Sequence, residues 1–125
     1  MARPIQIALD CTDPSKLAHF WASVLGYEVV RLSEDGARAF LSDPQGMGPR
    51  LLLHRVPEPK RTKNRLHLDV YVSPWGAPPA EAKPILDAEA ERLRALGATE
   101  LCAIEKPDEY FIVMSDPEGN EFCIA

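Results

Sequence analysis

The sequence lacks the features of a membrane span and of a nucleic-acid-binding surface. No stretch of its 125 residues approaches the roughly 20 consecutive apolar residues that cross a bilayer. Lysine and arginine together number 14 against 19 aspartates and glutamates, so the formal net charge is −5. Proteins that bind the phosphate backbone normally carry a basic stripe instead. We therefore expect neither a membrane nor a nucleic acid as a partner.

Cysteine is also scarce. Cys11, Cys102 and Cys123 are an odd number, and none of them lies in a CxxC motif. This usage fits reduced thiols, and we therefore expect a cytoplasmic protein. What the sequence does contain is an apolar fraction of 46%, which together with the length fits one globular domain with a hydrophobic core.

A short phrase occurs twice in the chain. Residues 42–46 read SDPQG and residues 115–119 read SDPEG, and each follows a short run rich in apolar residues. Asp, Pro and Gly by themselves only shape a turn. The two phrases and the glycines that end the two expected helices, Gly26 and Gly97, recur in the same order at a nearly constant separation. A repeat that keeps both order and spacing indicates a duplicated architectural unit.

The first half of the chain predicts a strand, a helix and three more strands. Residues 5–11 are rich in β-forming side chains. Asp13 is a candidate N-cap for a helix that starts at Pro14, and Gly26 stands where a left-handed residue commonly ends a helix. Apolar side chains at three- and four-residue spacing place one face of this helix in the core. The later strands are expected at 27–33, 37–42 and 50–56.

The second half repeats this order after a proline-containing linker at 57–64. A Pro-rich lead-in at 73–84 precedes the expected helix at 85–97. The side chains of this helix that are expected to face the core are Ile85, Leu86, Leu93 and Leu96. The strands of this half are expected at 65–72, 98–105, 109–115 and 120–125. The single domain, residues 1–125, would then contain a first βαβββ module at 1–56 and a second at 65–125.

Four segments carry a family resemblance. LDCTDPSKLAHFWASVLGYEV, NRLHLDVYV, RLRALGA and SDPEGNEFCI resemble the vicinal oxygen chelate (VOC) superfamily, and within it the bacterial glyoxalase-like domain subgroup. The superfamily includes glyoxalase I, extradiol dioxygenases, and bleomycin- and fosfomycin-resistance proteins. The resemblance implies an α+β fold of two βαβββ modules whose curved antiparallel sheets face a central cleft. It also implies a small-molecule ligand and a homodimer.

The superfamily's metal enzymes place one ligand at each of four strand positions, usually His or Gln, Glu, His and Glu. The resemblance puts Gln6, Leu53, His67 and Cys123 at these positions. Leucine cannot bind a metal, and His54 could replace it only if the strand were shifted by one residue, because such a shift reverses the face. A lone thiol in an oxygen and nitrogen site is unusual. We therefore expect a degenerate site, at most a weakly bound Zn, Ni, Mn or Fe ion, and no standard glyoxalase I or extradiol dioxygenase activity.

Alternation along the strands places further polar residues on the faces that would line the cleft. Asp10 and Asp69 are expected there and need partners, since an unpaired buried charge is costly. The candidate partners are Arg50, Arg55, Arg65, His54 and His67. A pair with a histidine would give either a structural ion pair or a general base oriented by a carboxylate, and the sequence leaves both open. The candidate catalytic residues are His67 and Glu121. The candidate substrate-binding residues are Gln6, Asp10, His54, Asp69, Tyr71, Trp75 and Cys123.

These observations leave two functions from different classes. One is an enzyme, a lyase or isomerase of the superfamily, that uses His67 with Gln6 and a labile divalent cation. The other is a metal-free protein that sequesters a small molecule such as an antibiotic. A third interpretation is a domain that only dimerises or regulates. The fold alone does not select among them, because function depends on the few side chains that line the site.

Overall fold

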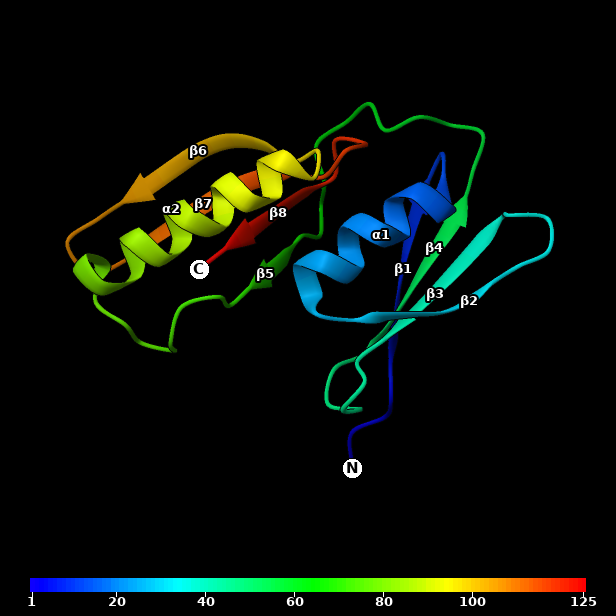
Figure 1. The fold of residues 1–125 in the computed structure, drawn as a ribbon, viewed down its shortest axis with the longest axis horizontal. Helices are drawn as coiled ribbons and strands as arrows, with labels where there is room; N and C mark the ends of the chain where they lie inside the picture. The colour runs from blue at the N-terminus through cyan, green and yellow to red at the C-terminus, as the bar shows by residue number, and fades with distance from the viewer. The chain divides into compact units, whose positions relative to one another are not determined.

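The computed structural model describes residues 1–125 and divides the chain into two compact units, Met1–Lys60 and Arg61–Ala125. Each unit contains one four-stranded sheet and one helix (Figure 1). The elements of the first unit are β1 (Gln6–Cys11), α1 (Pro14–Leu25), β2 (Glu28–Leu32), β3 (Arg38–Ser42) and β4 (Arg50–Arg55). Those of the second are β5 (Leu68–Val70), α2 (Pro79–Ala95), β6 (Thr99–Glu105), β7 (Tyr110–Ser115) and β8 (Glu121–Ile124). The order βαβββ occurs twice, which confirms the predicted α+β fold class.

The signals that predicted α1 are all used in the structure. The side chain of Asp13 accepts a hydrogen bond from the backbone N–H of Lys16 at 3.2 Å, and Pro14 occupies the first turn. Gly26 ends the helix in the left-handed conformation, with φ of 69°. A side chain larger than hydrogen would be strained at this φ, so local residues determine both ends of α1.

The second helix begins earlier than expected. The sequence predicted a start at residue 85 because proline normally interrupts a helix, but α2 begins at Pro79 and contains Pro84. Pro79 suits the first helical turn, where a missing N–H costs nothing. Pro84 is exposed, while Ala82 and Leu86 on either side of it are 3% and 0% exposed. Packing of these two side chains therefore holds the first turns against the sheet despite the proline.

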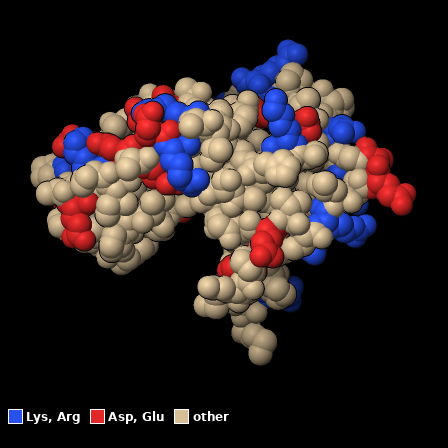
Figure 2. Space-filling model, viewed as in Figure 1, with Lys and Arg blue, Asp and Glu red and all other residues tan.

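The earlier start of α2 also changes which side chains face its core. The buried residues are Ala82, Leu86, Ala90 and Leu93, which recur at helical spacing. Ile85 and Leu96, which were expected in the core, are instead 36% and 43% exposed. The outer side of α2 carries interleaved acidic and basic side chains, as Figure 2 shows, with ion pairs such as Arg92–Glu89. Neither helix is long and apolar enough to cross a membrane.

Both sheets are mixed rather than wholly antiparallel as the resemblance implied. Their strand orders are β1-β4-β3-β2 and β5-β8-β7-β6. The first strand of each sheet runs parallel to the last, and the remaining neighbours are antiparallel. A helix follows each first strand and returns the chain to the far side of the sheet, so the last strand is added beside the first (Figure 1). Strand β5 is shorter than the expected 65–72, since its ladder with β8 spans only Leu68–Val70.

Each sheet has one buried face, which packs against the helix of its own unit, and one face turned away from that helix, which we call the open face. In the first unit the core face contains Leu51, Leu53, Ala39 and Leu41, each no more than 2% exposed. In the second unit it contains Ile112, Met114, Phe122 and Ile124, each 0% exposed. Because side chains alternate along a strand, the residues between these positions lie on the open faces.

Candidate functional site

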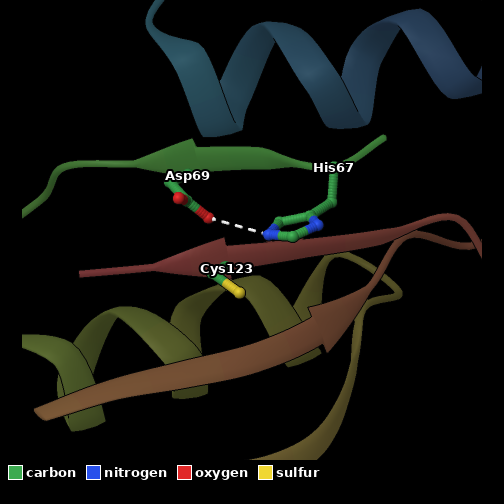
Figure 3. A group of neighbouring side chains, drawn as sticks. All are labelled: His67, Asp69 and Cys123. Carbon is green, nitrogen blue, oxygen red and sulfur yellow. Dashed lines mark ion pairs between the residues drawn. The ribbon is translucent and has the colours of Figure 1, made fainter. Parts of the chain in front are cut away.

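Three potential donor side chains meet on the open face of the second sheet. His67 lies just before β5, Asp69 lies within it, and Cys123 is the neighbour of Asp69 on β8. A ring nitrogen, a carboxylate oxygen and the thiol sulfur of these residues all lie within 4.8 Å of one another. Figure 3 shows the imidazole and the carboxylate turned toward each other along β5, with the thiol on the adjacent strand. The alternation of β5 therefore brings together two residues that the sequence placed on one face.

Asp69 is the central group of this cluster. Its Oδ1 lies 3.3 Å from Nε2 of His67, and both side chains are about half exposed, at 51% and 52%. The sequence predicted a buried Asp69 that would need a partner; the side chain is half exposed, so burial does not require its pairing with His67. A carboxylate beside one imidazole nitrogen favours the ring tautomer that carries its proton there and leaves the other nitrogen available to a ligand.

Cys123 differs from its neighbours because it is only 8% exposed. Burial, together with the charge of Asp69 and a hydrogen bond to it, raises the pKa of its thiol to about 11. A thiol with such a pKa is protonated at neutral pH, and the nucleophilic form of cysteine is the thiolate. Without a cation beside it, Cys123 is therefore a polar wall of the site and not an activated nucleophile.

The cluster opens into a cavity of about 410 Å³, a size that suits a small organic molecule. Its lining residues are His67, Asp69, Tyr71, Glu109, Tyr110, Phe111, Cys123 and Ala125, all from the second unit. Aromatic side chains form part of the wall. Tyr71 also contacts the exposed Trp75, with ring centroids 4.6 Å apart. The cavity thus combines a polar cluster with flat apolar surface.

Four lining residues were not singled out from the sequence: Glu109, Tyr110, Phe111 and Ala125. Phe111 and Glu109 belong to the segment that was expected only as a strand. The period-two alternation of β7, in which Tyr110, Ile112 and Met114 are buried, would have placed Phe111 on the opposite face. That β7 lies near β5 depends on the strand order, which the sequence pattern does not reveal.

Glu121, the second catalytic candidate, is engaged in an ion pair. Its carboxylate pairs with the ammonium of Lys63 at 2.5 Å and is 18% exposed. Its backbone N–H donates to the side chain of Asn64 at 3.2 Å. Glu121 is not among the residues that line the cavity, so its observed contacts tie β8 to the residues that precede β5.

The open face of the first sheet has different chemistry. Nε of Arg50 donates to Oε1 of Gln6 at 2.6 Å, so this candidate ligand atom already has a cationic partner. Asp10 and His54 face each other on neighbouring strands, with Oδ1 and Nδ1 3.9 Å apart. The first unit therefore contains a looser histidine–aspartate pair and no thiol beside it.

The register of β1 and β4 corrects the second ligand position. Leu53, which the resemblance placed there, pairs with Leu9 and lies on the core face, 0% exposed. The residue that corresponds to Cys123 is Leu52, because Leu52 pairs with Ala8 two residues after Gln6. Asp69 likewise pairs with Cys123 two residues after His67. His54 does lie on the open face, but two residues beyond Leu52.

The donor set therefore does not fit the four-ligand pattern of the superfamily's metal enzymes. Leu52 offers no donor atom, and Oε1 of Gln6 already accepts a charge-assisted hydrogen bond from Arg50. In the second unit, by contrast, His67 and Cys123 both carry donor atoms on the open face. In the first module, the donor atom of Gln6 is already paired and Leu52 carries none.

The fold and a family model together define the class of the protein as a glyoxalase-like member of the VOC superfamily. The family model described as the glyoxalase-like domain matches residues 6–125, so the chain belongs to that family. No curated protein matches the sequence.

Solved structures of the superfamily share the fold at low sequence identity. A glyoxalase/bleomycin resistance protein/dioxygenase family enzyme from Burkholderia phytofirmans is 18% identical, with a TM-score of 0.72 over 95% of this chain and 94% of that chain. A mutant of the fosfomycin resistance protein FosX from Listeria monocytogenes, complexed with Mn(II) and 1S,2S-dihydroxypropylphosphonic acid, is 16% identical, with a TM-score of 0.71 over 99% and 90%. Lactoylglutathione lyase from Agrobacterium tumefaciens is 22% identical, with a TM-score of 0.63 over 99% and 92%.

Proposed function

We propose that the chain binds a small organic molecule in the cavity on the open face of the second sheet. The observation that carries this proposal is the His67–Asp69 pair, which lies at 3.3 Å on the wall of a cavity of about 410 Å³. Ligand sites typically combine apolar and aromatic surface with a few convergent polar groups. Phe111 and Tyr71 supply the aromatic surface, and the His67–Asp69 pair supplies the polar groups. A ligand with a flat apolar part and one polar group that hydrogen-bonds to imidazole matches this surface.

The same pair supports chemical transformation of the ligand as a second candidate function. A histidine whose ring is oriented by a carboxylate is the usual form of a general base near neutral pH. His67 would then accept a proton from the bound molecule, and Asp69 would stabilise the imidazolium that results. A lyase or isomerase would need such a base. Sequestration of a molecule such as an antibiotic would need only the cavity.

The remaining expectations belong to the same proposal. A homodimer and a cytoplasmic location follow from the resemblance and from the cysteine usage, and the linker is proposed at 57–64. Tyr71, Trp75 and Cys123 are proposed as ligand contacts in the second module. Light scattering during size-exclusion chromatography would measure the mass of the particle and test the dimer directly.

A ligand screen with matched variants tests the binding proposal. Purified protein would be screened by thermal shift, in the presence of EDTA, against metabolites and aromatic antibiotics. A ligand at 100 times its Kd stabilises the folded state by about 2.7 kcal/mol. We expect His67→Ala and Asp69→Asn to reduce this shift strongly. The matched control is His54→Ala, which removes the corresponding histidine–aspartate pair from the first module.

The outcome that contradicts the proposal is equally specific. Ligands that shift His67→Ala as much as the unmodified chain, or lose their effect in His54→Ala, would place binding outside the second module's cavity. Failure of every compound in a broad screen would favour the interpretation as a dimerising or regulatory domain. If a ligand is found, conversion of that ligand to a product by the unmodified chain, followed by chromatography, would separate the enzyme from the binding protein.

A further inference from the structure

We propose that His67, Asp69 and Cys123 form a site for one divalent cation of the Zn²⁺ class, held by the second module alone. The small-molecule function proposed above requires no cation, so this inference goes beyond that function and stands or fails separately. Asp69 occupies none of the four ligand positions of the superfamily pattern, and no residue of the first module takes part. The proposed site therefore uses a donor set that differs from the superfamily's four ligands, and all of its donors lie on a single sheet.

The geometry of the three donor atoms is close to that of a metal site. Tetrahedral zinc binds nitrogen and oxygen at about 2.0–2.2 Å and sulfur at about 2.3 Å, which puts neighbouring ligand atoms about 3.5 Å apart. The atoms of His67 and Asp69 are already 3.3 Å apart, and all three atoms lie within 4.8 Å of one another. Rotation of the half-exposed His67 and Asp69 side chains is sufficient to bring the three donors to the shorter spacing.

The backbone beneath the site is well supported. Asp69 and Cys123 are register partners in the β5–β8 ladder, and the neighbours of Cys123 on β8, Phe122 and Ile124, are 0% exposed in the core. Ligands placed on packed strands hold a site more accurately than ligands on loops. The cavity lies on the other side of the three donors, so the fourth coordination position faces open space. An open fourth position is the arrangement of catalytic zinc sites.

The donor types determine which cation is favoured. A thiolate and an imidazole select zinc over magnesium, calcium and manganese, which prefer sites made entirely of oxygen. Binding replaces the thiol proton of Cys123 with the metal, and the proton passes to the buffer. No oxidant or reductant is involved. A superfamily site with carboxylates at both glutamate positions would instead prefer harder cations. The metal preference therefore distinguishes the proposed site from a superfamily site.

Cobalt and zinc titrations of the metal-free full chain test this site. We expect one equivalent of Zn²⁺ per chain by calorimetry, and with Co²⁺ a sulfur-to-cobalt charge-transfer absorption in the near ultraviolet. Cys123→Ser should abolish that absorption. His67→Ala and Asp69→Asn should each weaken Zn²⁺ binding by about 100-fold or more, since even residues that only support ligands contribute 10- to 100-fold.

Matched variants exclude adventitious binding. Cys102→Ser removes the exposed thiol, and His54→Ala removes the histidine of the first module; both should bind Zn²⁺ like the unmodified chain. Circular dichroism of each variant in EDTA checks that it is folded, and Cys123→Ala gives a second variant at the buried position. Absence of saturable Zn²⁺ binding, or binding that survives Cys123→Ser and His67→Ala, would overturn the proposal. Organic ligands that bind in EDTA while zinc does not would leave the small-molecule function intact.

Discussion

The two modules share one fold but carry different functional side chains on their open faces. On the second open face, Asp69 stands beside Cys123, with His67 two residues earlier. At the corresponding register of the first sheet, Ala8 stands beside Leu52. Burial of a helix-facing strand face is a requirement of folding in both modules, whereas the open face has no such requirement. The duplicated unit can therefore keep its core pattern while the donors become concentrated in one copy.

The first open face has its own character. The guanidinium groups of Arg31 and Arg50 lie 5.4 Å and 5.3 Å from the centroid of the Phe40 ring, one on each neighbouring strand. Cations over an aromatic face are attracted by its quadrupole. Gln6 accepts a hydrogen bond from Arg50. This surface is therefore a network of arginines, one amide and one aromatic ring. Its positive charge disfavours a metal cation, which strengthens the contrast with the second module.

The largest effect we predict separates the two faces of β4. Leu53→Ala removes a side chain that is 0% exposed and leaves a cavity, so it should lower the free energy of unfolding by about 3 kcal/mol. His54→Ala on the open face should change stability by less than about 0.5 kcal/mol. Urea unfolding of both variants measures the difference. A larger effect of His54→Ala than of Leu53→Ala would mean that β4 presents its opposite face to the core.

The next prediction compares the thiols. Cys102 is exposed, whereas Cys123 is 8% exposed and has a pKa raised to about 11. At pH 8 and in EDTA, Cys123 should be alkylated roughly 100-fold more slowly than Cys102, because reaction requires the thiolate. Mass spectrometry of timed iodoacetamide reactions measures both rates in one sample. Rapid modification of Cys123 would contradict its description as a neutral wall of the cavity.

The two SDP turns give the third comparison. Asp116 is 2% exposed and accepts hydrogen bonds from the backbone N–H groups of Glu118 and Asn120 and from the side chain of Asn120. Asp116→Ala leaves these donors without their partner and should cost about 2 kcal/mol. Asp43, in the first turn, is more exposed, so Asp43→Ala should cost less. Thermal unfolding of both variants tests this order, and a larger effect at Asp43 would reverse it.

The sequence predicted most of the fold because local signals and packing agree. Asp13, Pro14 and Gly26 define α1, and the alternation in β5 correctly placed His67 and Asp69 on one face. The repeat itself indicated the order of the elements.

The sequence-based predictions were wrong where tertiary packing overrode a local preference. Pro84 argued against a helix that the burial of Ala82 and Leu86 nevertheless holds together. Leu53 was matched by counting along the chain, which cannot determine the face of a strand to within one residue. The resemblance did name Cys123, but its place beside Asp69 depends on β8 lying next to β5, and strand order is set by packing and not by periodicity.

The smallest effect we predict is a pH dependence that originates in the first module. Backbone N–H groups of Gln45, Gly48 and Met47 donate to Asp43 and lower its pKa below the ordinary 3.8. A carboxylate whose pKa is depressed by folding contributes stability above its unfolded pKa and loses it as pH falls through the lower, folded value. The contribution of Asp43 should therefore be constant from pH 7 to about 5 and decline below about pH 4.

Asp43→Asn provides the control for this pH dependence, because an amide cannot titrate but keeps one acceptor oxygen. The melting temperature of this variant should fall less steeply below about pH 4 than that of the unmodified chain, and the two curves should run parallel above about pH 5. Asp35 has a similarly lowered pKa from the N–H of Ala37 and the hydroxyl of Ser33, so the double variant Asp35→Asn/Asp43→Asn should flatten the acid limb further. Parallel curves over the whole range would show that neither turn of the first module contributes to acid sensitivity.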